Sequence, residues 1–157
     1  MSTRRKAREL ALCALYAYEF SKNPLKQVEE EIISDKADDA EILKFAGSLF
    51  KSTIKHGNEL DELIKIKALN WDFNRIAVMD KLILRMAICE FLRFGDIPPK
   101  VSIDEAIEIS KKYSTEKSGK FINGILDSVL SDLRKSDRLN KKGRGLIDGN
   151  TRKSEPF

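Results

Sequence analysis

The sequence lacks the long hydrophobic runs of membrane proteins and contains few cysteines. None of its 157 residues belongs to an apolar stretch of about 18 residues, so no membrane-spanning helix is expected. The basic start leads into a helix that carries charged residues, unlike the short apolar core of a signal peptide. The two cysteines, Cys13 and Cys89, lie in apolar helical runs, which favours reduced core thiols over a disulfide. We therefore expect a cytoplasmic protein.

The sequence also lacks the residue groups that catalysis and metal binding require. Its only histidine, His56, follows a lysine near the end of a predicted helix and is interpreted as a solvated residue. We find no cysteine and histidine cluster spaced for zinc, no glycine-rich phosphate loop after a strand and no paired-carboxylate site. We predict that the protein is not an enzyme and needs no metal or cofactor.

Strand patterns are absent as well, and almost every segment has the spacing of a helix. Two predicted helices, Thr3–Ser21 and Asn74–Phe94, are apolar around nearly their whole circumference, which is typical of buried central helices. The other predicted helices cover about residues 24–33, 39–56, 60–66, 102–113 and 116–134. The Ser102-Ile103-Asp104-Glu105 segment has the pattern of a capping box, so we expect a helix to begin there.

These helices predict an all-α fold of two packed helical bundles, each built around one central apolar helix. The two subdomains would cover about residues 1–70 and 71–134. Residues 135–157 are poor in apolar side chains, so we expect a disordered basic tail. From Arg134 onward the chain has eight basic and three acidic residues, which leaves residues 1–133 with a net charge of −1. Any basic surface on the folded part must therefore be local.

The first predicted helix begins with four cations, Arg4, Arg5, Lys6 and Arg8, and no acidic residue precedes Glu9. Cations at a helix N-terminus oppose the helix dipole. The cluster therefore suggests an anionic partner, such as the phosphates of RNA or DNA. The alternative is a solvated helix start with no partner.

A second basic group surrounds the turn at Tyr113. Its members are Lys111, Lys112, Lys117 and Lys120, and Phe121 follows directly. Aromatic side chains beside lysines suit stacking on unpaired bases. By itself this group is weak evidence, because lysine-rich helix faces are usually only solvated.

Gly124 lies within the last predicted helix, although glycine disfavours a helix by about 1 kcal/mol relative to alanine. On an ideal helical wheel it falls nearly opposite the apolar stripe, while Phe121 lies at the edge of that stripe beside Lys117 and Lys120. Packing of the helix on its own core does not explain this glycine. We expect RNA backbone or a neighbouring helix to approach the surface there.

Three charged residues are embedded in the apolar Asn74–Phe94 helix. Glu90 is expected to be a partly buried carboxylate paired with a nearby Arg or Lys, with a partner contact as the alternative. For Asp80 and Arg85, internal ion pairs and an exposed edge for a protein partner are equally compatible with the pattern.

Taken together, four segments of this sequence resemble the NusB family of bacterial transcription antitermination factors. They are Arg4–Glu9 followed by Ala14-Leu15-Tyr16, Asp80–Ala87 with Glu90-Phe91, Ile97–Glu108, and Lys120–Asp127. The resemblance implies two three-helix bundles and a non-enzymatic RNA-binding role. It further implies action with NusE, a ribosomal protein of the small subunit, on the boxA element of ribosomal RNA leader transcripts. Other Nus factors and RNA polymerase would be partners in the same assembly.

Site residues also follow from the resemblance. The first helix, with Arg4, Arg5, Lys6 and Arg8, is implied to be RNA surface. The region of Phe121 and Asn123 and the lysines before it are implied to lie close to RNA. The helix around Asp80 and Arg85 is implied to be part of the NusE surface.

Other functions and states remain open. The chain also resembles the N-terminal part of ribosomal RNA cytosine methyltransferases, so it could be a stand-alone recognition module of such a system. It could instead be a helical protein-interaction scaffold whose lysines are only solvated. A homodimer that hides the RNA surface when the protein is free is a further possibility.

Overall fold

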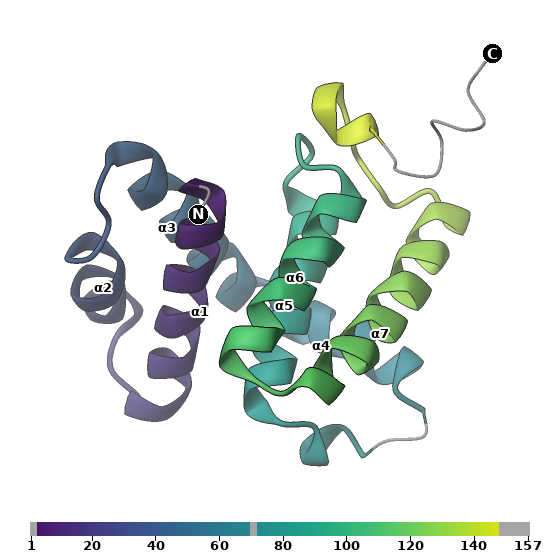
Figure 1. Ribbon diagram of the computed structural model, residues 1–157, viewed down its shortest axis with the longest axis horizontal. Coiled ribbons are helices and arrows are strands. Elements are labelled where there is room, and N and C mark those ends of the chain that lie inside the picture. Colours follow the sequence, from purple (N-terminus) through teal and green to yellow (C-terminus); the bar gives the residue numbers. More distant parts are fainter. Residues whose placement is uncertain (1–2, 70–71, 148–157) are drawn as a thin grey trace.

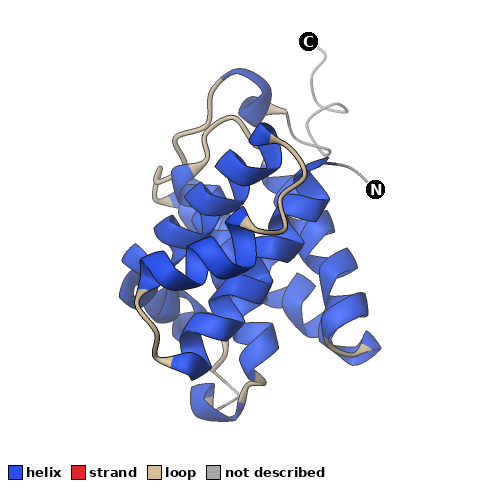
Figure 2. Cartoon of the chain, turned by 90° about the vertical axis from the view of Figure 1, so that its left-hand side faces the viewer, coloured by secondary structure: helices blue, strands red, loops and turns tan. Residues whose placement is uncertain are grey.

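The computed structural model describes residues 3–69 and 72–147, and every regular element in these ranges is helical (Figures 1 and 2). The helices are α1 (Thr3–Ser21), α2 (Leu25–Val28), α3 (Ala40–Lys55), α4 (Gly57–Lys67), α5 (Val78–Arg93), α6 (Pro99–Tyr113) and α7 (Glu116–Lys135). A π-helical segment, η1 (Glu29–Ser34), extends α2, and two 3-10 turns are η2 (Phe73–Arg75) and η3 (Gly143–Leu146). The predicted all-α fold is confirmed.

The N-terminal bundle consists of α1, α2 with η1, and α3 (Figure 1). Asp39 begins α3, because its side chain accepts a hydrogen bond from the backbone N–H of Ile42 at 2.9 Å. Burial of Leu12, Leu49 and Phe50 between α1 and α3 removes their apolar surface from water and stabilises this half.

The C-terminal half is built around α5, which α4, α6 and α7 contact. Ten residues of α5 are buried, which confirms its prediction as a central helix. The predicted division near residue 70 stays a prediction, although α4 packs mainly on α5 and α7.

The outer face of α1 differs from the expectation of a helix buried all round. Its bounds agree with the prediction, but Tyr16 is 44% exposed and Phe20 is 56% exposed. The two rings contact each other in a tilted arrangement, with centroids 4.7 Å apart and planes at 49°. An apolar circumference therefore did not mean full burial, because no other described element covers this side of α1.

The expected helix start at Ser102 is wrong. Pro99 is the first residue of α6, where its fixed φ suits a helix and its missing N–H costs no hydrogen bond. Ser102 lies one turn inside the helix and is buried, and its hydroxyl donates to Glu90 at 2.7 Å.

The expectation of disorder after residue 134 does not hold for residues 136–147. These residues leave α7 and return to the turn between α5 and α6, where the backbone N–H of Lys142 donates to the carbonyl of Gly95 at 3.0 Å. The rest of the predicted tail, residues 148–157, lies outside the described residues.

Within residues 3–69 and 72–147, no helix is both long and apolar enough to cross a membrane. The two cysteines are free thiols, with Cys89 buried and Cys13 half-buried.

Candidate nucleic-acid interface

Each of the four cations at the start of α1 has an acidic partner from another part of the chain. The pairs are Arg4 with Asp96 at 3.8 Å, Arg5 with Glu105 at 2.8 Å, Lys6 with Asp38, and Arg8 with Glu90 at 2.7 Å. The argument that no acid relieves these charges considered only neighbours along the sequence. Folding supplies the acids, so the cluster is no longer evidence of an anionic partner by itself.

Arg8 is a core residue, and the expectation that it lies on the RNA surface is wrong. It is 3% exposed, and its guanidinium donates two hydrogen bonds to Glu90, which is 1% exposed. Burial opposes the charge of Arg8, but the charge and hydrogen bonds of Glu90 outweigh it and raise the guanidinium pKa. The predicted pairing of Glu90 with a basic residue is confirmed.

Arg5 and Arg4 remain partly accessible at the surface. The two hydrogen bonds from Arg5 to Glu105 hold the pKa of that carboxyl below its usual range. The guanidinium of Arg4 lies over the ring of Phe45, 4.1 Å from its centroid. Their side chains are 35% and 39% exposed, so both can still contact an incoming anion.

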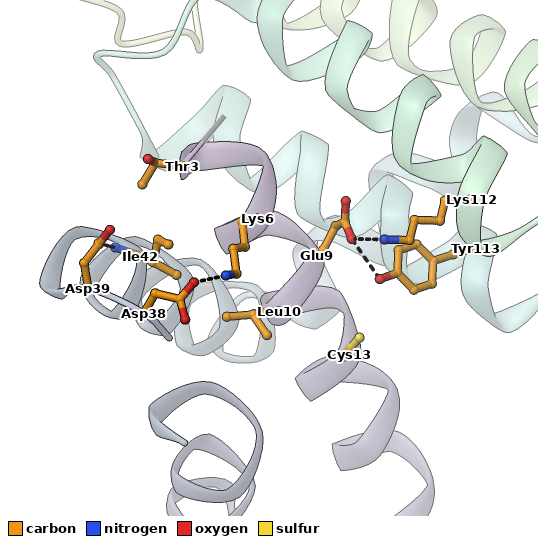
Figure 3. A pocket seen from close by; sticks show the side chains of 10 residues that line it. All are labelled: Thr3, Lys6, Glu9, Leu10, Cys13, Asp38, Asp39, Ile42, Lys112 and Tyr113. Carbon is orange, nitrogen blue, oxygen red and sulfur yellow. Dashed lines mark hydrogen bonds and ion pairs between the residues drawn. The ribbon is translucent and has the colours of Figure 1, made fainter. Parts of the chain in front are cut away.

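Charged side chains also meet at the contact between α1 and α6, which lie side by side in Figure 1. Glu9 of α1 accepts hydrogen bonds from the amine of Lys112 at 2.7 Å and from the hydroxyl of Tyr113 at 2.9 Å (Figure 3). Burial of Tyr113 and its bond to Glu9 raise the tyrosine pKa. Lys112 and Lys111 remain 58% exposed, and Lys111 pairs with Glu108 of the same helix.

An open pocket of about 600 Å³ borders this contact on the side of α3 (Figure 3). Lys6 with its partner Asp38 lies on one wall, and Glu9 with Lys112 lies on the other. Cys13 and Leu10 form the floor between them in the view of Figure 3.

The start of α7 carries the least neutralised cations among the predicted residues. Thr115 caps the helix by accepting the backbone N–H of Ser118 at 3.2 Å. Lys117 and Lys120 are exposed and have no ion pair within the described ranges. Asn123 is also exposed, whereas Phe121 is half-buried.

A pocket of about 310 Å³ joins this helix start to the segment before α5. Its lining residues are Arg75, Ile76, Ala77, Asp80, Thr115, Lys117, Ser118 and Phe121. Two cations, Arg75 and Lys117, therefore border a pocket whose apolar lining includes the aromatic ring of Phe121. Sequence reasoning missed Arg75, because it lies 42 positions before Lys117 and only the tertiary structure brings them together.

Gly124 is open to its surroundings, as the helical wheel predicted. A Cβ added at this position would meet no atom within 4 Å among the described residues. Packing within the described part of the chain therefore does not require glycine here.

Asp80 is not available to a protein partner, which corrects one of its two interpretations. It is 7% exposed, and its carboxylate accepts the hydroxyls of Ser114 at 2.7 Å and Ser118 at 2.9 Å. Its role is to hold the start of α7 against α5. It is bound by hydroxyls rather than by the expected cation.

Arg85 forms an internal ion pair that stays partly exposed. Its guanidinium donates two hydrogen bonds to Asp61 of α4, at 2.6 and 3.0 Å, and its side chain is 20% exposed. It borders a shallow groove between α1, α4 and α5, so it can still contribute to a protein interface.

The fold thus brings most of the predicted RNA-binding residues to the contact between α1 and α6 and to the start of α7. Arg4, Arg5 and Lys6 lie at one end of the α1–α6 contact, Lys111 and Lys112 at the other, and α7 begins just beyond them. Arg8 and Asp80 fall below the surface. No group of His, Cys, Asp and Glu among the described residues is arranged to hold a metal ion.

Comparisons with known proteins identify the family. Residues 5–131 match the NusB family. The transcription antitermination protein NusB of Salinibacter ruber is 47% identical over 152 residues, which are 96% of this chain and 95% of that protein.

Solved structures show the same fold. A crystal form of NusB from T. maritima superimposes with a TM-score of 0.77 at 38% identity, over 84% of this chain and 93% of that one. A structure of the antitermination factors NusB and NusE with double-stranded RNA gives a TM-score of 0.76 at 23% identity, over 84% and 98% of the chains. The matched region includes the basic start of α1, all of α6 and the start of α7, and the chain belongs to the NusB family of transcription antitermination proteins, which are not enzymes.

Proposed function

We propose that this protein binds the boxA element of ribosomal RNA leader transcripts as a single strand, together with NusE. In this role it would join other Nus factors on RNA polymerase, in the cytoplasm, and suppress termination. Family membership supports the antitermination role. The solved complex of a NusB with NusE and double-stranded RNA supports the choice of RNA and NusE as partners.

The observation that carries the proposal is the pair of unneutralised lysines at the start of α7. Lys117 and Lys120 lie beside Phe121 and the open backbone at Gly124, with Arg75 across the adjoining pocket. Lysines without acidic partners attract phosphate, and a half-buried ring offers an edge or face to an unpaired base.

We propose that NusE binds the side of α1 that no other described element covers. Tyr16 and Phe20 are exposed there, and Arg85 borders the neighbouring groove with Glu19. Exposed aromatic pairs are typical of protein interfaces, where they supply much of the binding energy. In the free protein, a homodimer would cover the RNA surface.

The test is the affinity for boxA RNA, single-stranded and as a duplex, with and without NusE at one fixed salt concentration. We expect NusE to raise the affinity and the double variant Lys117→Glu, Lys120→Glu to lower it on the order of tenfold or more, about 1.4 kcal/mol. The matched control is Lys26→Glu, Lys55→Glu, which changes two exposed lysines of the N-terminal bundle by the same charge.

Two results would contradict the proposal. One is an affinity that NusE leaves unchanged; the other is equal binding by the α7 variant and its control. A protein that elutes from RNA at low salt both alone and with NusE would support the scaffold function instead. The ion pairs that neutralise Arg4, Arg5 and Lys6 on α1 are the observation that favours this scaffold function.

A further inference from the structure

The chain continues past the family match, which ends at residue 131, and residues 136–147 form a segment that we call the C-terminal strap. The strap follows α7 and is docked on the turn between α5 and α6, near the top of the view in Figure 1. Leu139 packs against the core, and Arg138 pairs with Glu59 of α4 at 3.1 Å. These contacts give the strap a defined position.

Lys141 anchors the strap to the end of α5. Its amine donates hydrogen bonds of 2.9 Å to the carbonyls of Glu90 and Phe94. These carbonyls lie at the C-terminal end of α5, where the helix dipole favours a cation. Each also accepts one backbone N–H, from Phe94 at 3.2 Å and from Ile97 at 3.1 Å, so Lys141 adds a second donor to each. Burial lowers the pKa of Lys141 to about 8, and even the neutral amine keeps two N–H donors for the two carbonyls.

Two glycines allow the strap to approach the turn closely. Gly145 is buried, and a Cβ added to it would collide with the carbonyl oxygen of Gly95. A Cβ added to Gly95 would lie 2.7 Å from the carbonyl oxygen of Asn140. Backbone therefore packs on backbone here, and a larger residue at position 145 would displace the strap.

Docking leaves two strap cations facing outward. Lys142 and Arg144 are exposed and have no ion pair in the part of the chain that the structure describes. Lys142 lies against Gly95, and the next residue, Asp96, pairs with Arg4 at the start of α1.

We propose that the C-terminal strap extends the RNA surface, with Lys142 and Arg144 binding phosphates of the strand beyond Arg4. The proposal rests on the proposed RNA-binding function. RNA fits better than a protein because the two outward strap side chains, Lys142 and Arg144, are cations that form no ion pair with any described residue. A docked strap also binds with a smaller loss of chain entropy than a disordered tail.

The first arm of the test changes charge. We expect Lys142→Glu, Arg144→Glu to lower the affinity for boxA RNA about tenfold at low salt. The slope of log K against log salt should also become less steep by about 1.4, because each phosphate contact on a single strand contributes about 0.7. The control Lys26→Glu, Lys55→Glu should leave both quantities unchanged.

The second arm changes position without changing charge. Gly145→Val should raise amide hydrogen exchange in residues 136–147 and lower the affinity, because its side chain would collide with the carbonyl oxygen of Gly95. Exchange in α5 reports whether the variant is otherwise folded. An affinity that stays unchanged while the strap undocks would overturn the proposal.

The outcomes also separate the two proposals. If the Lys142 and Arg144 variant binds RNA normally while the Lys117 and Lys120 variant does not, only the strap proposal fails. If both variants bind normally, the proposed RNA-binding function fails and the strap proposal with it. A strap variant that loses NusE but keeps full RNA affinity and slope would assign the strap to a protein and overturn the proposal.

Discussion

At the scale of single residues, the main feature is the buried pair of Arg8 and Glu90. Ser102 donates a third hydrogen bond to the same carboxylate, so α1, α5 and α6 meet at one satisfied charge network. A charge buried to this extent is stable only with its partner, because an unpaired ion in a core keeps its full desolvation cost. Arg8 therefore stabilises the fold by neutralising Glu90 and is too deeply buried to contact a ligand directly.

Arg8→Met is expected to lower the free energy of unfolding by about 3–5 kcal/mol, because it leaves Glu90 charged and unpaired in the core. The measurement is urea unfolding at neutral pH. The double variant Arg8→Met, Glu90→Met should recover most of the loss, since it removes both charges. Equal stability of wild type and Arg8→Met would show that the pair is not buried in solution.

At the scale of elements, α7 combines a well-capped start with a glycine that its own packing does not need. Thr115 caps the helix, and Asp80 accepts the hydroxyls of Ser114, just before the helix, and Ser118, in its first turn. Gly124 lies on the exposed side of the same helix, where the nearest described atoms leave room for a side chain. Gly124 thus lowers the stability of α7 at one position on the surface that we propose for RNA.

Gly124→Ala is expected to raise the free energy of unfolding by about 0.5–1 kcal/mol, because alanine favours the helix and its Cβ meets no described atom. Urea unfolding checks this value. Gly124→Leu should fold equally well and bind boxA RNA more weakly. If the leucine variant binds with undiminished affinity, the surface at Gly124 serves a neighbouring helix instead.

At the scale of the whole molecule, ion pairs connect the two bundles. Arg5 and Arg8 of α1 reach Glu105 of α6 and Glu90 of α5, and Arg85 of α5 reaches Glu19 of α1. The N-terminal bundle therefore supplies a countercharge that the core of the C-terminal half requires. We infer that neither half is stable alone.

One cooperative unfolding transition is therefore expected, despite the two bundles of the fold. Calorimetry should give equal calorimetric and van't Hoff enthalpies, and far-UV circular dichroism should report the same midpoint. A separate fragment of residues 72–157 should fail to unfold cooperatively, because Glu90 would lack Arg8. Two resolved transitions in the intact protein would instead support independent subdomains, as the predicted division near residue 70 allows.

Local patterns predicted the elements well, and their failures have a common cause. The start of α7 at Thr115 and the openness of Gly124 follow from capping and from helical spacing, which depend on nearby residues only. Ser102 was misassigned as a cap because Glu90, the group that it bonds, lies on another helix. Arg75 was missed for the same reason, since its cavity partners come from α7.

The sequence by itself determined that this chain forms helices with two apolar centres, and its motifs identified the NusB family, because periodicity and spacing are local properties of the chain. Only the tertiary structure decided which charges remain available. It buried Arg8 and Asp80 and gave acidic partners to Arg4, Arg5 and Lys6. It left Lys117 and Lys120 without an ion pair to any described residue. Whether a charge is neutralised depends on residues far away in sequence, which are brought within bonding distance only by folding.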